Sequence, residues 1–227
     1  TSPAATMNAS FSYRLGSVGK AIDKVRIVID SSVVEEGATD GEIIIYGPNV
    51  MQGYHNRPED TRAAMTPDGG FRTGDRGRLD KDGFLFITGR IKEQYKLENG
   101  KFCFPVSLEE EICLVPYVQQ AVIYGMNRPF NICIVVPDFD VLQSWAKEKG
   151  LPADAKALVA RQDVVDMFST VITNHLKGKF GGYEIPKKFL ILPEPFTLDN
   201  GMLTQTMKLK RKVVLDNFKD RIDALYK

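Results

Sequence analysis

The distribution of apolar residues changes near residue 90, and this change constrains the fold more than any other feature of the chain. Up to about Thr88, the apolar residues stand in short, β-branched runs separated by glycine and proline, which is typical of antiparallel strands. Beyond Arg90, short apolar runs alternate with longer segments whose apolar residues recur at helical spacing. We therefore predict an α+β protein in two parts, a β-rich domain over residues 1–89 and an α+β domain over residues 90–227.

The same patterns predict the elements of each part. In the first part we expect a small antiparallel sheet with strands at 25–29, 42–46, 71–73 and 84–88, and one short helix at 59–65. In the second part we expect strands at 119–124, 132–136 and 189–192, and helices at 107–114, 138–149, 163–177 and 213–226. Residues 150–157 are expected to form an exposed loop.

Composition narrows the classes of function. The 30 lysines and arginines balance 29 acidic residues, so no overall field favours nucleic acid as a partner. No stretch approaches the roughly 20 apolar residues that span a bilayer, and the amino end lacks a signal peptide, which predicts a cytoplasmic protein. The three cysteines have no metal-binding spacing and are expected to be reduced core thiols.

Thr1 leads without an initiator methionine into a polar stretch, which we interpret as part of a longer chain.

Two glycine-punctuated segments place charged groups beside strands. In Phe71–Gly77, a carboxylate, a hydroxyl and two arginines surround glycines on an expected turn; Asp75 there could accept hydrogen bonds from both hydroxyls of a ribose. A tight turn with a solvated ion pair gives the same pattern. In Thr88–Gly100, Arg90, Lys92 and Lys96 would share one face of an extended strand and suit phosphate or ribose oxygens, or form a solvated basic edge.

A third segment, Asn200–Lys212, leads from a glycine turn into four cations within five positions. Basic charge at the amino end of a helix is electrostatically unfavourable, so at least one lysine is expected to serve function. A solvated helix start or a weak polyanion-binding patch remains the alternative.

The order and spacing of these segments resemble the adenylate-forming superfamily, which includes acyl-CoA synthetases, luciferases and adenylation domains of peptide synthetases. Three stretches carry the resemblance in the first part: Gly41–Thr61, Phe71–Gly77 and Gly83–Arg90. Three later stretches are most similar to the long-chain fatty acid CoA ligases: Tyr183–Phe189, Leu192–Thr197 and Leu203–Lys212. In the last of these, Thr206-Met207 replaces the Ser-Gly that other branches carry before the final lysine.

The resemblance implies a reaction and a set of site residues. A fatty acid and ATP would form an acyl-adenylate and pyrophosphate, and coenzyme A would then displace AMP. It implies Lys208 as the catalytic residue with Lys210 as fallback, Asp75 and Arg90 as nucleotide-binding residues, and Lys92 as the hinge of a rotating lid. The loop that meets the nucleotide and coenzyme A would comprise Lys96, Gly100, Lys101 and Phe102.

The resemblance also implies that some parts of the enzyme lie outside this chain. The phosphate loop, the fatty-acyl tunnel and the groups that hold Mg²⁺ belong to the missing amino-terminal part, so no metal ligand is expected in this chain. We therefore expect residues 1–227 alone to lack synthetase activity.

Three alternatives stay open. One is an acyl-AMP ligase or adenylation domain that loads a carrier protein instead of coenzyme A. Another is a non-enzymatic module that binds polyanions through Lys208–Lys212, which neutral charge and the lack of interleaved aromatic residues disfavour. The third concerns location: the apolar stripe of the last helix is expected to pack on its own domain, and peripheral membrane contact is its alternative.

Overall fold

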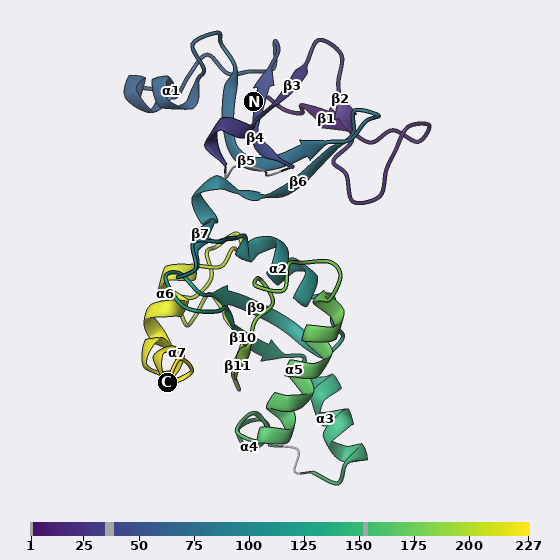
Figure 1. Cartoon of the computed structure of the whole chain (residues 1–227), viewed down its shortest axis with the longest axis vertical. Coiled ribbons are helices and arrows are strands. Elements are labelled where there is room, and N and C mark those ends of the chain that lie inside the picture. The colour runs from purple at the N-terminus through teal and green to yellow at the C-terminus, as the bar shows by residue number, and fades with distance from the viewer. Residues whose placement is uncertain (1, 35–38, 152–153) are drawn as a thin grey trace. The chain divides into compact units, whose positions relative to one another are not determined.

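The structure is a computed structural model that describes residues 2–34, 39–151 and 154–227, without the side chain of Lys92. The chain divides into two compact units, Thr1–Gln94 (unit 1) and Tyr95–Lys227 (unit 2) (Figure 1). Together the units give the α+β class expected from the sequence. The predicted boundary between residues 89 and 90 falls within a strand of unit 1.

Unit 1 is built on a four-stranded antiparallel sheet in the order β3-β4-β5-β6. The strands are β3 (Arg26–Asp30), β4 (Gly41–Tyr46), β5 (Phe71–Leu79) and β6 (Leu85–Arg90). Beside them lie a two-stranded ribbon, β1 (Thr6–Met7) and β2 (Lys20–Ala21), the 3-10 helix η1 (Ser31–Val33) and the helix α1 (Pro58–Ala64). Ile43 and Ile45, two positions apart on β4, point to one face and pack with Leu85 in a small core.

One predicted element of unit 1 is wrong in extent. The strand expected at 71–73 continues to Leu79, and the expected turn at Asp75 lies inside it. The strand continues because Gly74 takes a positive φ of 71° and a register shift between Arg76 and Gly77 absorbs the irregularity. Pairing on both sides, with β4 and β6, then holds the whole segment extended.

Unit 2 contains a three-stranded sheet in the order β11-β10-β9. β9 (Val118–Tyr124) pairs antiparallel with β10 (Ile132–Pro137), and β10 pairs parallel with β11 (Lys188–Ile191). A short hairpin of β7 (Tyr95–Lys96) and β8 (Phe102–Cys103) opens the unit, after the 3-10 helix η2 (Ile91–Glu93) of unit 1. The helices are α2 (Pro105–Ile112), α3 (Phe139–Glu148), α4 (Ala155–Val159), α5 (Gln162–Leu176), α6 (Arg211–Asn217) and α7 (Lys219–Ala224).

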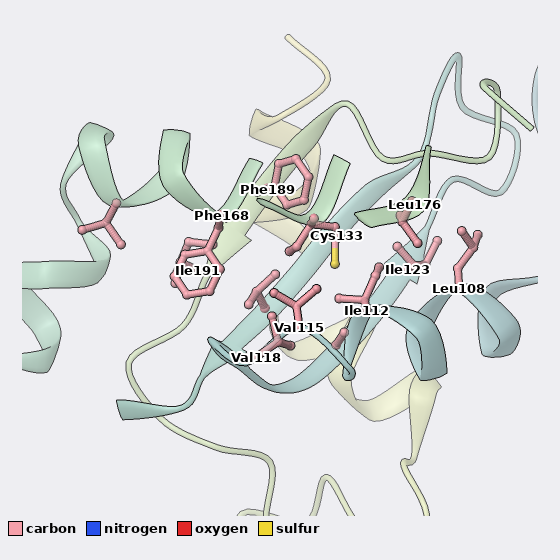
Figure 2. Close-up of a cluster of buried hydrophobic side chains, with 14 of the residues drawn as sticks. Leu108, Ile112, Val115, Val118, Ile123, Cys133, Phe168, Leu176, Phe189 and Ile191 are labelled. Carbon is pink, nitrogen blue, oxygen red and sulfur yellow. The ribbon is translucent and has the colours of Figure 1, made fainter. Parts of the chain in front are cut away.

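The central strand β10 is apolar throughout because both of its faces are covered. Successive side chains point to opposite faces, so Cys133 and Val135 enter one core while Ile132 and Ile134 enter another. The first core, packed under α2 and α5, is drawn in Figure 2. The second core is closed by α6, α7 and the segment that leads to them.

The helices of unit 2 follow the predictions with two corrections. Asp138 caps α3 as expected, accepting a hydrogen bond from the N–H of Val141 at 3.2 Å. The expected loop at 150–157 contains the start of α4, because Asp154 caps that helix and Leu158 is buried in the first core; residues 152–153 lie outside the described part.

The last predicted helix, 213–226, is two helices that meet at Phe218. Phe218 leaves helical geometry at φ −109° and ψ 15°, directly after Asn217, a weak helix former. The apolar stripe packs against the second core of the same unit, as expected. Among the described residues, no helix is both long and apolar enough to cross a membrane.

The cysteine prediction holds for two of three positions. Cys103 and Cys133 are buried, whereas Cys113 is exposed because it follows the last residue of α2 at the surface.

Candidate functional site

Asp75 and Arg90 are brought together by strand pairing in unit 1. They are direct partners in the register of β5 and β6, and Nε of Arg90 lies 3.2 Å from Oδ1 of Asp75. The Asp75 side chain is 34% exposed and that of Arg90 is 59% exposed, so the pair remains open to solvent on one side. Two residues that sequence analysis placed at one site are therefore adjacent.

The pair lines a cavity of about 630 Å³ that lies wholly within unit 1. Its walls come from β4, β5, the end of β6, η2 and α1, and include Glu42, Tyr54, Arg57, Phe71, Asp75 and Arg90. Burial raises the pKa of the Asp75 carboxyl; the nearby Arg90 lowers it and Glu93 raises it. The cavity thus presents a partly desolvated carboxylate beside a guanidinium, with apolar and aromatic surface nearby.

A buried carboxylate in the wall of the cavity holds the backbone that carries Asp75. Glu42 on β4 is only 7% exposed, and it accepts hydrogen bonds from Gly74 N–H at 3.1 Å and from Arg72 at 2.6 Å. Arg72 also contacts Asp30 at 3.2 Å, so the buried charge is paired. Sequence analysis missed Glu42, although a lone carboxylate before three isoleucines on an expected strand was the available signal.

Thr73 fixes the local conformation further. Its hydroxyl donates to the carbonyl of Ile43 at 2.8 Å and accepts from the N–H of Asp75 at 3.1 Å. Hydrogen bonds at Thr73, Gly74 and Asp75 therefore fix the backbone from which the Asp75 side chain extends.

The basic segment after β6 does not form the extended strand considered from the sequence. β6 ends at Arg90, the chain turns through η2, and β7 begins at Tyr95. The shared face proposed for Arg90, Lys92 and Lys96 is therefore wrong, because a helical turn separates them. Arg90 belongs to unit 1 and Lys96 to unit 2; Lys92 lies in η2, and its side chain is outside the described part of the structure.

The loop residues predicted after this turn gather in the β7–β8 hairpin of unit 2. Lys96 pairs with Phe102 in the register, and its ammonium lies 4.7 Å from the centre of the Phe102 ring. Gly100 has a φ of 81° at the hairpin turn, which favours glycine, and its N–H donates to the carbonyl of Leu97. The ammonium of Lys101 lies 4.6 Å from the centre of the Tyr183 ring. All four predicted residues therefore belong to one small structure.

Lys208 lies on a closed loop of unit 2, Met202–Lys210, called here the lysine loop. Thr204 holds it twice: the Thr204 N–H donates to the Lys208 carbonyl at 2.8 Å, and the Lys208 N–H donates to the Thr204 hydroxyl at 3.0 Å. Lys210 N–H donates to the carbonyl of Met202 at 2.8 Å and closes the loop. Lys208 and Lys210 are both exposed, so the structure leaves either lysine available.

Comparison with known proteins finds similar sequences, although no model of a protein family matches the chain. It is 35% identical over 221 residues to long-chain-fatty-acid–CoA ligase FadD15 of Mycobacterium tuberculosis, covering 94% of this chain and 34% of that protein. It is 36% identical over 192 residues to human long-chain-fatty-acid–CoA ligase 1, covering 82% of this chain and 27% of that protein. The chain thus spans between about a quarter and a third of the length of these relatives.

A solved structure shares both the fold and part of the sequence. The adenylation domain of a carboxylic acid reductase from Segniliparus rugosus, in complex with AMP and a carboxylic acid, matches 92% of this chain with a TM-score of 0.72 and 25% identity, over 32% of that chain. Together with the ligase relatives, this match shows that the chain is homologous to a part of the long-chain fatty acid CoA ligases and shares its fold with adenylate-forming enzymes.

Proposed function

We propose that this chain supplies the ribose-contact site and the mobile catalytic lid of an ATP-dependent long-chain fatty acid CoA ligase. The observation that carries the proposal is the Asp75–Arg90 pair on adjacent strands at the wall of the unit 1 cavity, in a chain related to such ligases. The fatty acid carboxylate attacks the α-phosphate of ATP, forming acyl-adenylate and releasing pyrophosphate. The thiol of coenzyme A then attacks the acyl carbon, and AMP leaves.

The cavity suits the nucleoside part of ATP. Its volume of about 630 Å³ lies in the usual range of small-molecule sites, roughly 300–1,000 Å³. An ionised Asp75 accepts hydrogen bonds from both ribose hydroxyls, and Arg90 donates to ribose or phosphate oxygens beside it. Phe71 and Tyr54 add aromatic surface to the same wall. The resemblance implies that the Mg²⁺ ligands belong to a part of the enzyme outside residues 1–227.

Lys208 supplies the positive charge for the first step. When a carboxylate approaches a polyphosphate, negative charge spreads over the reacting oxygens, and a cation held there lowers the barrier. The exposed amine of Lys208 at the end of a hydrogen-bonded loop suits this role, and Lys210 is its alternative.

The junction between the units acts as the hinge. Lys92 lies in η2, two residues before the division at Gln94, where a short helical turn joins two strands of different units. A few residues at an element end are typical of positions that absorb a large backbone change. Rotation at this junction would withdraw the lysine loop from the nucleotide after the first step. It would bring in the hairpin of Lys96, Gly100, Lys101 and Phe102, which then meets coenzyme A.

The test uses the full-length protein that contains this chain, with pyrophosphate release and acyl-CoA formation measured separately. Lys208→Ala should lower the rate of adenylation by about a hundredfold or more, while thioesterification of supplied acyl-adenylate stays near the parent rate. Lys212→Ala, another exposed lysine of the same segment, is the matched control and should change neither. Equal loss of both half-reactions in Lys208→Ala would contradict the assigned role.

Two further experiments identify the acceptor of the acyl group and test whether residues 1–227 are active alone. Assays with coenzyme A and with a carrier protein separate the ligase from a carrier-loading enzyme. The 227-residue chain alone should form no acyl-CoA, and product formation by it would overturn the division of roles between this chain and the rest of the protein.

A further inference from the structure

A bidentate ion pair joins Glu109 of α2 to Arg211, the first residue of α6. Both terminal nitrogens of Arg211 donate to the two carboxylate oxygens of Glu109, each at 2.6 Å. The side chains are 27% and 12% exposed, respectively, so water screens this pair less than a surface pair. A bidentate arginine–carboxylate contact fixes orientation as well as distance.

The same two side chains cover the outer edge of the sheet. β9 is an edge strand, and the N–H of Ile123 donates to Oε1 of Glu109 at 2.7 Å. The carbonyl of Ile123 accepts from Arg211 at 3.2 Å. Glu109 and Arg211 thus satisfy both backbone groups of one edge residue and attach the start of α6 to the sheet.

This attachment replaces a conventional helix cap. Lys210, at the N-cap position of α6, makes no side-chain capping bond, and the first turn contains no acidic residue. Arg211 adds positive charge at the positive end of the helix, which is unfavourable by itself. The Glu109 carboxylate offsets this charge from another element, so the position of the helix start depends on the pair.

The lysine loop ends one residue before this anchor. Its internal bonds, from Thr204 to Lys208 and from Met202 to Lys210, set its shape. Those bonds do not set its position on the unit, because both partners of each belong to the loop. Leu203, buried in the second core with Met202 and Leu209 packed against that core, attaches the loop to the unit, and Arg211 directly after Lys210 attaches its carboxyl-terminal end to the sheet edge.

We propose that Glu109 and Arg211 are positioning residues for Lys208: they fix the carboxyl-terminal end of the lysine loop and hold the ammonium in register for adenylation. The inference rests on the proposed function, since it acts through Lys208. Without the pair, the apolar contacts keep the loop on the unit, and its carboxyl-terminal end shifts relative to the sheet.

The test is made in the full-length protein with Glu109→Gln, Arg211→Lys and Arg211→Met. Glu109→Gln keeps the size and an oxygen for the Ile123 N–H, removes the charge, and replaces one of the two oxygens that accept from Arg211 with an amide donor. Displacement of a catalytic group by about 1 Å can cost about a hundredfold, so we expect Arg211→Met to lower the kcat of adenylation by at least about tenfold. Arg211→Lys and Glu109→Gln should give intermediate losses. The KM for ATP and the rate of thioesterification from supplied acyl-adenylate should stay within about twofold of the parent.

Asp223→Asn is the matched control. Asp223 forms an ion pair with Arg128 in the same unit and, within the described part of the chain, makes no hydrogen bond or ion pair with the lysine loop, so its loss should leave both half-reactions unchanged. Melting temperatures identify variants that fail to fold. If the Arg211 variants fail, the adenylation rate of the isosteric Glu109→Gln variant tests the inference. Equal loss of both half-reactions, or full adenylation in folded Glu109→Gln and Arg211→Lys, would overturn the inference. Lys208→Ala, measured in parallel, separates this outcome from failure of the proposed function, in which that variant too would keep full adenylation.

Discussion

The hydroxyl of Tyr95 donates a 2.7 Å hydrogen bond to Oδ1 of Asn131, and both side chains are buried in unit 2. Tyr95 is the first residue of the unit, directly after the junction, and Asn131 directly precedes the central strand β10. The amide of Asn131 also donates to the Glu184 carbonyl at 2.7 Å and contacts the sulfur of Cys103 at 3.1 Å, and burial raises the pKa of that thiol to about 11. The network fixes the start of unit 2 to its sheet, so a hinge motion would be confined to residues before Tyr95.

Tyr95→Phe should lower the free energy of unfolding of unit 2 by about 1–2 kcal/mol, because Asn131 Oδ1 would stay buried without this donor. Asn131→Leu should cost more, because it leaves the Tyr95 hydroxyl and the Glu184 carbonyl without the amide. Urea unfolding followed by circular dichroism measures both. Tyr13→Phe, at an exposed position, serves as control. A Tyr95→Phe effect no larger than that of the control would rule out a stabilising role for this bond.

Met207 in the lysine loop adopts a φ of 59°, a left-handed conformation that disfavours residues other than glycine. Its side chain is 65% exposed, so Met207→Gly removes little packing. The strain relieved is about 1–2 kcal/mol and the added entropy of the unfolded chain costs about 0.5–1 kcal/mol, so we expect a net gain of up to about 1.5 kcal/mol. Met126→Gly, at another exposed methionine but without positive φ, should instead destabilise. Thermal unfolding compares the two, and equal losses would contradict the argument from strain.

Burial raises the pKa of Asp75 in the folded unit above its ordinary value, so the ionised carboxylate destabilises unit 1 at neutral pH. The unfavourable contribution disappears as the pH falls below the unfolded pKa, because Asp75 is then protonated in both states. Asp75→Asn should therefore raise the urea midpoint of unit 1 at about pH 7, with the gain shrinking toward about pH 3. Asp23→Asn, at an exposed position, provides the control. A gain that grows as the pH falls would have the wrong sign for this mechanism.

Sequence reasoning located most elements because their signals are local. The Asp138 cap, the apolar run of β10 and the helical spacing in α5 each depend on residues within a few positions of one another. Where a distant partner decided the outcome, the local signal failed. β5 runs on past its glycine because β4 and β6 pair with it, and α4 forms because Leu158 finds the first core.

The candidate site follows the same division. The sequence by itself determined which chemical groups are present and their order along the chain: a carboxylate and arginine near two expected strands, a glycine hairpin and a late lysine. Only the tertiary structure decided that Asp75 faces Arg90, that the buried Glu42 holds Gly74, and that Arg211 reaches Glu109 across 102 positions of sequence. Strand register and core packing bring such groups together, and both depend on apolar contacts between residues far apart in the chain, which a local pattern does not contain.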